Sequence, residues 1–181
     1  MDYSDPIDSY TGTIGTLSFG HKKQITIGGE DCLSFYTFEG KMPHKPLVAL
    51  EVWDMAPDNW PKILNDIYGD VYEDPVKWAR KCVEEFKARA ISIKLASTDP
   101  NGLGRSPEEA AQVVKKMVEA VDVPIIVYGT GNLEKDAEVM KKVAEASAES
   151  DIIIGPAQED NYKAITATAL GYKKKSLDRP R

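Results

Sequence analysis

The sequence predicts an α/β fold, because a short apolar strand, a polar turn and an amphipathic helix follow one another four times. Strands that alternate with helices form parallel sheets with right-handed crossover connections. We expect the four strands at Leu47–Trp53, Ile91–Leu95, Ile125–Tyr128 and Ile152–Ile154. Four such units correspond to half of a (β/α)8 barrel of the TIM type, and an open flavodoxin-like sheet fits the same alternation.

Helix-start signals follow the strands at the expected spacing. Asp74 before Pro75 combines an N-cap with a proline at the first helical position, where its missing N–H removes no hydrogen bond. Ser106 and Glu109 have the spacing of a capping box, again with a proline next to the cap. The other two helices are expected over Leu133–Ala148 and from Asp160 or Asn161 to Leu170.

The residues before the first core strand predict a separate element. Gln24–Ile27 and Leu33–Phe38 flank a Gly-Gly turn, which is typical of a β-hairpin. In a barrel, such a hairpin often covers the amino-terminal mouth. Residues 1–20 are polar and rich in small residues, so we expect a flexible arm there.

The predicted domain therefore spans residues 21–172, as a partial barrel preceded by the hairpin. Residues 173–181 contain five lysines and arginines and little apolar content, which predicts a basic tail. A complete barrel would need its fifth strand at this point.

Composition narrows the classes of function. A net charge of −6 argues against a nucleic-acid partner, because binding to phosphates needs a basic surface. No apolar run approaches the roughly 20 residues that span a bilayer, and the first residues do not resemble a signal peptide. We therefore expect a cytoplasmic protein. Two cysteines, Cys32 and Cys82, are too few for a Cys₄ metal or iron–sulfur site on this chain.

Polar residues gather after the predicted strands, at the sheet edge where parallel α/β proteins bind ligands. Amides and hydroxyls outnumber possible acid–base pairs, which suits hydrogen bonding to a large polar ligand better than proton transfer. The candidate binding residues are Asp54, Asp99, Thr130, Asn132, Gln158 and Asn161.

Most of these candidates also have a purely structural interpretation. Asn132 and Asn161 lie where helices begin, so we expect N-capping for both. Asp99–Gly102 is a turn sequence first, and Gly129–Gly131 is a tight turn that lacks the rest of a phosphate-binding motif. Lys94 lies within a strand, and if it faces the barrel axis its ammonium group needs a partner.

Catalytic and metal-binding groups are not indicated. His21 and His44 both precede the predicted strands, and neither belongs to the Asp-x-His-x-x-Gly pattern with which many cobalamin proteins supply a histidine ligand. No Ser/His/Asp or Cys/His arrangement can be argued from the positions of these residues.

Several segments, in order along residues 24–172, resemble the small subunit of the corrinoid iron–sulfur protein. In archaea this is the delta subunit of the acetyl-CoA decarbonylase/synthase complex. The segments are Thr26–Asp31, Leu33–Glu39, Leu50–Asp54, Ile93–Leu95 with Asp99–Pro100, Val127–Gly131, Glu134–Asp136, Glu159–Lys163 and Thr166–Ala169.

The resemblance implies a TIM barrel that forms a heterodimer with a large subunit. A cobamide would lie between the two subunits, and the large subunit would carry the iron–sulfur cluster. The cobamide would accept a methyl group from a tetrahydropterin and deliver it to acetyl-CoA synthase, so a methyltransferase and the synthase would be transient partners. This chain would then be a methyl-carrier subunit rather than a catalyst by itself.

The sequence departs from the resemblance in lacking about four βα units of a full barrel. Two other interpretations remain open. The chain could be an enzyme that binds a methylpterin directly through Asp54, Asp99 and Asn132, or a structural subunit of a larger complex.

Overall fold

The computed structural model describes residues 6–178, and its helices and strands alternate as the sequence predicts. The strands are β1 (Leu17–Phe19), β2 (Ile25–Ile27), β3 (Leu50–Trp53), β4 (Ile91–Lys94), β5 (Ile125–Tyr128), β6 (Ile153–Ala157) and β7 (Lys175–Asp178). The helices are α1 (Lys62–Tyr68), α2 (Pro75–Glu84), α3 (Pro107–Ala120), α4 (Leu133–Ala146) and α5 (Tyr162–Gly171), with a 3₁₀ turn η1 (Ala96–Thr98).

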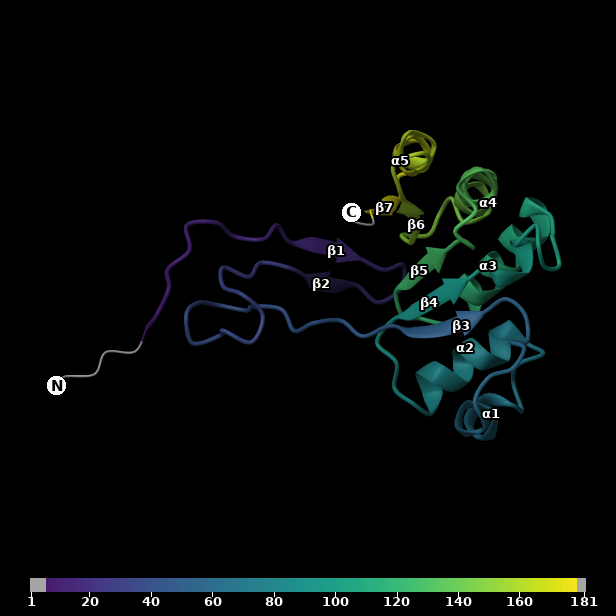
Figure 1. The fold of residues 1–181 in the computed structure, drawn as a ribbon, viewed down its shortest axis with the longest axis horizontal. Helices are drawn as coiled ribbons and strands as arrows, with labels where there is room; N and C mark the ends of the chain where they lie inside the picture. The colour runs from purple at the N-terminus through teal and green to yellow at the C-terminus, as the bar shows by residue number, and fades with distance from the viewer. Residues whose placement is uncertain (1–5, 179–181) are drawn as a thin grey trace.

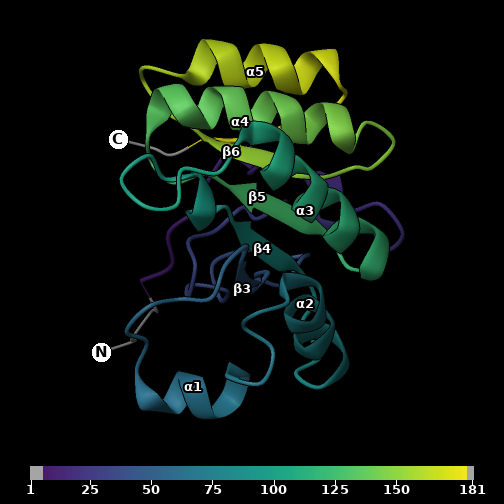
Figure 2. The same cartoon turned by 90° about the vertical axis from the view of Figure 1, so that its right-hand side faces the viewer.

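Strands β3 to β7 form one parallel sheet in the order β3-β4-β5-β6-β7. Helices α3, α4 and α5 lie side by side in front of this sheet in Figure 2, and α2 continues the row. A flavodoxin-like sheet has the order 2-1-3-4-5 with helices on both faces, and the sequential order of these five strands does not match it. The α/β class is confirmed, and these five strands do not close into a barrel.

The sheet buries one face because apolar residues alternate along its strands. Val52, Ile93, Val127 and Ile154 are fully buried and belong to one apolar core with residues of the helices. Cys82 of α2 belongs to the same core, and burial raises the pKa of its thiol to about 11. Within residues 6–178, no helix covers the opposite face (Figures 1 and 2).

The predicted helix starts are confirmed. The Asp74 carboxylate accepts hydrogen bonds from the backbone N–H of Val76 (3.1 Å) and Lys77 (3.2 Å). Ser106 and Glu109 form both bonds of a capping box. Helix α1, in the segment between β3 and α2, is not among the four predicted helices. None of the helices within residues 6–178 is both long and apolar enough to cross a membrane.

The expected basic tail contains a strand. Residues 175–178 form β7, which pairs with β6 as the fifth parallel strand, while residues 179–181 lie outside the described residues. Lys175 pairs with Asp151 (2.6 Å), so part of the basic character serves an ion pair. Backbone hydrogen bonds to β6 form the strand without an apolar sequence, which is why periodicity missed it.

A hairpin is present, but it does not pair the two strands that the sequence predicted. β2 pairs with β1, in antiparallel register from Leu17 opposite Ile27 to Phe19 opposite Ile25, and Leu33–Phe38 is not a strand. Gly28 and Gly29 therefore lie beside the segment that leads into β1 rather than in the turn of the hairpin. A Cβ at Gly28 would overlap the carbonyl oxygen of Gly15. The two glycines permit the close approach of two segments of the backbone. Sequence alone does not distinguish this role from that of a turn.

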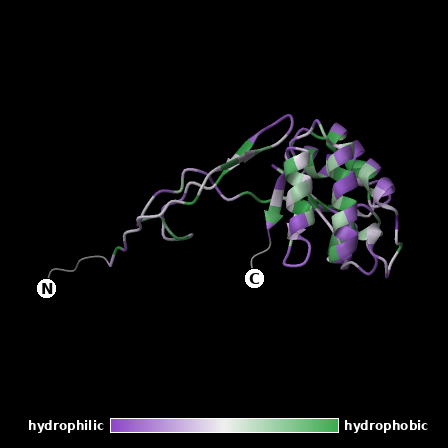
Figure 3. Cartoon of the chain, turned by 90° about the horizontal axis from the view of Figure 1, so that it is seen from above, coloured by the Kyte–Doolittle hydropathy of each residue, from purple (hydrophilic) through white to green (hydrophobic). Residues whose placement is uncertain are grey.

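Residues 6–48, which we call the arm, project away from the helices (Figures 1 and 3). Strand β1 belongs to the segment expected to be a flexible arm, of which residues 1–5 lie outside the described residues. The turn between β1 and β2 contacts the amino end of the sheet, where the Lys23 N–H donates to Asp122 (3.0 Å) and Lys22 pairs with the Asp122 carboxylate (3.0 Å). The hairpin thus touches the amino-terminal side, as expected.

Lys174 connects the end of α4 to the start of β7. Its buried ammonium group donates to the carbonyl oxygens of Ser147 (2.7 Å), Ala148 (2.9 Å) and Ser150. Carbonyl groups at a helix C-terminus lack helical partners, so a lysine there satisfies them and complements the helix dipole.

We predict that Lys174→Met lowers the free energy of unfolding by about 1–3 kcal/mol, because buried carbonyl groups lose their donor. Urea unfolding measures this change. The matched control is Lys141→Met on the exposed side of α4, which we expect to change stability by less than about 0.5 kcal/mol. Equal effects of the two substitutions would contradict this role of Lys174.

Candidate functional site

A cavity of about 340 Å³ lies at the carboxyl ends of β3, β4 and β5. This is the edge of the sheet at which the sequence predicted a binding site. Asp99 and Thr130, two of the six candidate residues, line the cavity. The lining also includes apolar side chains that the prediction missed, among them Trp53, Met55 and Leu103.

Trp53 and Lys94 form the floor of this cavity from adjacent strands. They are register partners, and both alternate with residues that point into the core. The Lys94 ammonium nitrogen lies 4.6 Å from the centre of the Trp53 ring, and the Trp53 indole N–H donates to Glu51 (2.6 Å). The partner that Lys94 was expected to need is therefore an aromatic ring, which stabilises a cation through its quadrupole. Period-two alternation in the strand could have identified Trp53.

The same row of the uncovered face continues into the neighbouring strands. Lys94 is the register partner of Tyr128, and Tyr128 is the register partner of Gly155. A Cβ at Gly155 would overlap backbone and side-chain atoms of Leu177, so this position accepts only glycine. The result is a strip of aromatic, cationic and small residues along the carboxyl edge.

Asp99 is held by a turn, as its sequence indicated. Its carboxylate accepts from the N–H of Asn101 (2.9 Å), and its carbonyl oxygen accepts from Gly102 (2.9 Å) and Gly104 (3.0 Å). The Asn101 N–H bonds to only one of the two carboxylate oxygens. The other oxygen can accept a hydrogen bond from a group in the cavity that Asp99 lines.

A buried carboxylate, which the candidate list omitted, fixes Thr130. Asp136, in the first turn of α4, accepts from the N–H groups of Thr130 and Gly131 (both 2.8 Å) and from the Thr130 hydroxyl (3.2 Å). A Cβ at Gly129 would overlap this carboxyl group. The Gly129–Gly131 segment is thus a tight turn, as interpreted, whose shape depends on Asp136. Nothing in the local sequence marks Asp136 except its place early in a helix.

Asp54 lies beneath the cavity rather than in its lining. Its side chain is 2% exposed, and its two oxygens accept from the N–H (2.9 Å) and the hydroxyl of Ser97. Burial raises the pKa of this carboxyl group, and the hydrogen bonds from Ser97 and the charge of Arg105 oppose that rise. Asp54 therefore ties the end of β3 to η1, and its role toward a ligand stays a prediction.

The remaining candidates lie further along the edge. Asn132 caps α4, since its side-chain oxygen accepts from the N–H of Lys135 (3.1 Å), which confirms the capping interpretation. Asn161 holds the N-cap position of α5, but its side chain makes no capping bond, so that expectation is wrong. Its oxygen accepts from the N–H of Gln158 (2.7 Å), and its amide group donates to Leu133 and Pro156 (both 3.5 Å). Tertiary hydrogen bonds outcompete the local one here.

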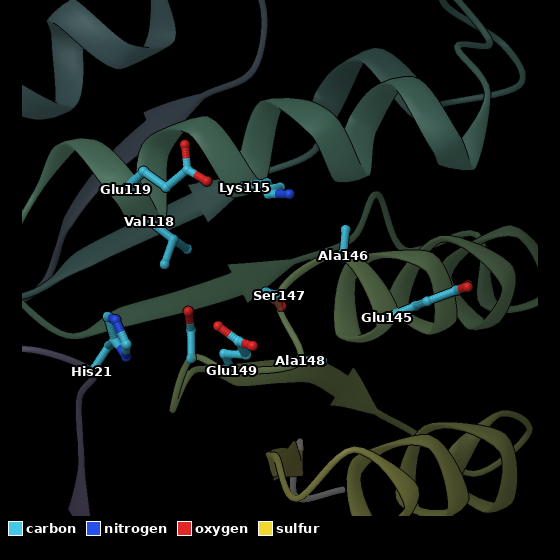
Figure 4. A pocket seen from close by; sticks show the side chains of 10 residues that line it. His21, Lys115, Val118, Glu119, Glu145, Ala146, Ser147, Ala148 and Glu149 are labelled. Atoms are coloured by element: carbon cyan, nitrogen blue, oxygen red, sulfur yellow. The ribbon is translucent and has the colours of Figure 1, made fainter.

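A second cavity, of about 420 Å³, lies at the opposite end of the sheet (Figure 4). It is lined by His21 and by residues near the ends of α3 and α4, including Lys115, Glu119 and Ser147. Parallel α/β folds bind their ligands at the carboxyl ends of the strands, so we take the cavity at Trp53 and Lys94 as the candidate site. Within residues 6–178, no three His, Cys, Asp or Glu side chains are placed to hold a metal ion.

Comparison with known proteins identifies the family. Residues 13–178 match the family described as CO dehydrogenase/acetyl-CoA synthase delta subunit. The chain belongs to this family. It is similar to the acetyl-CoA decarbonylase/synthase complex subunit delta of Methanocaldococcus jannaschii, with 36% identity over 95% of this chain and 44% of the relative. The corresponding values for the subunit of Archaeoglobus fulgidus are 38%, 91% and 38%.

These findings confirm the family to which the segments in residues 24–172 pointed. The chain spans less than half the length of these curated relatives. These relatives are named as subunits of a complex.

We predict that Gly129→Ala destabilises the fold by about 1–3 kcal/mol, because the new methyl group displaces the buried Asp136 carboxylate from its N–H donors. Thermal unfolding measures the change. Gly171→Ala is the matched control: Gly171 ends α5 with open space around it, so alanine there is expected to be neutral or slightly stabilising. If Gly129→Ala were equally neutral, the close approach of Asp136 would be wrong.

The raised pKa of Asp54 predicts a pH dependence of stability. A carboxyl group that binds its proton more tightly in the folded state contributes most below the unfolded pKa, near 3.8, and this contribution is lost as the pH rises through the folded pKa. We expect Asp54→Asn, which cannot titrate, to gain stability relative to wild type as the pH rises from 4. Urea unfolding between pH 4 and 7 tests this, with the exposed Asp58→Asn as control. A relative change in the opposite direction would refute it.

Proposed function

We propose that this chain is part of a corrinoid iron–sulfur protein and helps to hold a cobamide for methyl transfer. The methyl group would pass from a tetrahydropterin to acetyl-CoA synthase, and the chain would act as a carrier subunit rather than as a catalyst. The observation that carries the proposal is the family match over residues 13–178, combined with a cavity at the carboxyl ends of β3, β4 and β5. We propose a cytoplasmic location for this assembly.

The residues of the cavity suit contact with the edge of a corrinoid better than enclosure of the whole ring. A corrin ring carries amide side chains around an apolar macrocycle, and it is far larger than a cavity of about 340 Å³. Lys94 offers donors, Asp99 and Asp58 offer acceptors, and Trp53 offers an apolar ring. These groups would cover part of one face of the cofactor, and the rest would be held by a partner.

When bound, the cobamide supplies the cobalt centre that accepts and releases the methyl group. This chain would contribute by binding and orienting: Lys94 would donate to carbonyl groups at the ring edge, and Trp53 would exclude water from that edge. Asp54 and Asp136 would keep the loops after β3, β4 and β5 in place for these contacts.

The proposal also assigns the partner and the shape of the assembly. The large corrinoid subunit would carry the iron–sulfur cluster and the remaining contacts to the cobamide, and a methyltransferase and acetyl-CoA synthase would dock transiently. We further propose that the one-sided parallel sheet corresponds to half of a TIM barrel. Support comes from the sequential strand order and from relatives more than twice as long as this chain.

The structure gives less support to direct pterin binding through Asp54, Asp99 and Asn132. Both oxygens of Asp54 accept from Ser97, and the Asn132 side chain caps α4. Only Asp99 of the three retains a free position toward the cavity. A purely structural role predicts no change at the cofactor when this chain binds.

The test is a titration of the cobamide-loaded large subunit with this chain, followed by size-exclusion chromatography at the corrinoid absorbance. We expect co-elution and a change in the corrinoid spectrum. Lys94→Met is expected to weaken the spectral titration about tenfold, because a charge-assisted hydrogen bond contributes about 1.5 kcal/mol or more.

The control is Leu170→Gln, on an exposed position of α5 far from the candidate site, which should titrate as wild type. Co-elution without any spectral change would favour the purely structural role. Separate elution, or binding of a methylpterin by the chain alone, would overturn the proposal.

A further inference from the structure

Exposed apolar side chains concentrate in the arm. Nine of the fifteen large apolar side chains that are exposed within residues 6–178 lie in residues 7–48, although the arm is only about a quarter of that range. Figure 3 shows these hydrophobic segments along an extended ribbon, well away from the helices. Scattered exposed apolar residues are ordinary, but a concentration of this kind marks an interaction surface.

Four of these nine side chains lie in one short loop. Leu33–Phe38, which we call the aromatic loop, presents Phe35 at 95% exposure and Phe38 at 64%. The rings of Tyr36 and Phe38 lie 5.6 Å apart, so Tyr36 supports one side of the exposed group. Phenylalanine at this exposure contributes nothing to the core of this chain.

The backbone of the aromatic loop is held in an unfavourable conformation. Phe35 has a φ of +71°, in the left-handed region that aromatic residues rarely adopt. Such a conformation persists only where neighbouring bonds impose it, and it occurs preferentially at binding sites. The strain here directs a bulky ring into solvent, which is unfavourable unless the ring is covered in the assembly.

Hydrogen bonds across the arm impose this shape. The Tyr36 N–H donates to Leu33 (3.0 Å), and the Glu39 N–H donates to Tyr36 (2.9 Å). The Glu39 carboxylate accepts from the Tyr10 hydroxyl and from the Asp8 N–H (both 3.1 Å), so the aromatic loop is bonded to the first residues of the arm. A loop ordered before binding loses less conformational entropy when it docks.

The surface is large enough to form the centre of an interface. An aromatic side chain presents about 150–250 Å², so Phe35, Tyr36 and Phe38 together expose on the order of 400 Å². That is about half of what one partner buries in a standard interface of roughly 800 Å² a side. Acidic and lysine residues are equal in number over residues 6–48, so the matching surface is apolar rather than charged.

We propose that the aromatic loop docks the chain onto the large corrinoid subunit, with Phe35 inserted into an apolar pocket of that subunit. The inference rests on the proposed function for the identity of the partner, and relatives named as subunits of a complex support a partner other than a second copy. The arm projects from the side opposite the helices, the side of the uncovered sheet face (Figures 1 and 2), so one partner can contact both.

Phe35→Asn tests the docking role. Asparagine tolerates the left-handed conformation better than phenylalanine, so the melting temperature should stay the same or rise. The dissociation constant for the large subunit should increase about 30-fold or more, as expected for a buried aromatic anchor. Leu170→Gln again serves as the control that removes an exposed apolar side chain elsewhere. Surface plasmon resonance with immobilised large subunit measures the affinity, and sedimentation equilibrium measures self-association.

The outcomes separate this inference from the proposed function. If wild type binds and Phe35→Asn binds thirtyfold more weakly at unchanged stability, the docking role is supported. If both bind equally, the aromatic loop is not the anchor, while the proposed function stands. If wild type does not bind the large subunit at all, the proposed function fails. Dimerisation of wild type that Phe35→Asn abolishes would assign the loop to a second copy and overturn the inference.

Discussion

The handedness of the crossovers between parallel strands is the constraint on which the rest of the structure depends. Each strand from β3 to β6 leads through a helix to its neighbour, and with the strands in sequential order α2, α3, α4 and α5 fall on the same face of the sheet (Figure 2). The sheet consequently has two faces of different chemistry. Val52, Ile93 and Val127 fill a core on one face. Lys94 and Tyr128 lie half-buried on the other face, and Trp53 at the end of the edge strand packs against Trp60, with ring centres 5.4 Å apart. Parallel sheets are usually covered on both faces, so the open face is a natural place for a partner.

Two buried carboxylates convert this sheet edge into a defined surface. Asp54 joins the end of β3 to η1 through Ser97, and Asp136 shapes the turn after β5 through the N–H groups of Thr130 and Gly131. In each case a buried carboxylate accepts hydrogen bonds from backbone N–H groups of the loop that follows a strand. The two bonds act on neighbouring loops and fix where Asp99 and Thr130 lie. Polar residues at strand ends can thus be essential to a site without touching the ligand.

Sequence reasoning succeeded where the signal is local and failed where it is tertiary. Short apolar runs followed by helix signals located β3 to β6, and the caps at Asp74, Ser106 and Asn132 follow from side chains bonding to N–H groups two or three residues away. The strand β7 carries no apolar pattern, and its existence depends on pairing with β6. Asn161 has the right residue type at the right place, yet Gln158 and Leu133 take its hydrogen bonds. The role of Gly28 and Gly29 could not be predicted either, because glycine is favoured both in a turn and where two backbone segments approach closely.

Hydroxyl-radical footprinting of the chain, alone and with the cobamide-loaded large subunit, tests the central claim most directly. The claim is that the carboxyl-edge cavity and the arm both face that subunit. We expect protection of Trp53 and Met55 in the cavity and of Phe35 in the aromatic loop, with no change at Tyr162 of α5 on the helical side. Unchanged labelling of Trp53 in a complex that demonstrably forms would contradict the account.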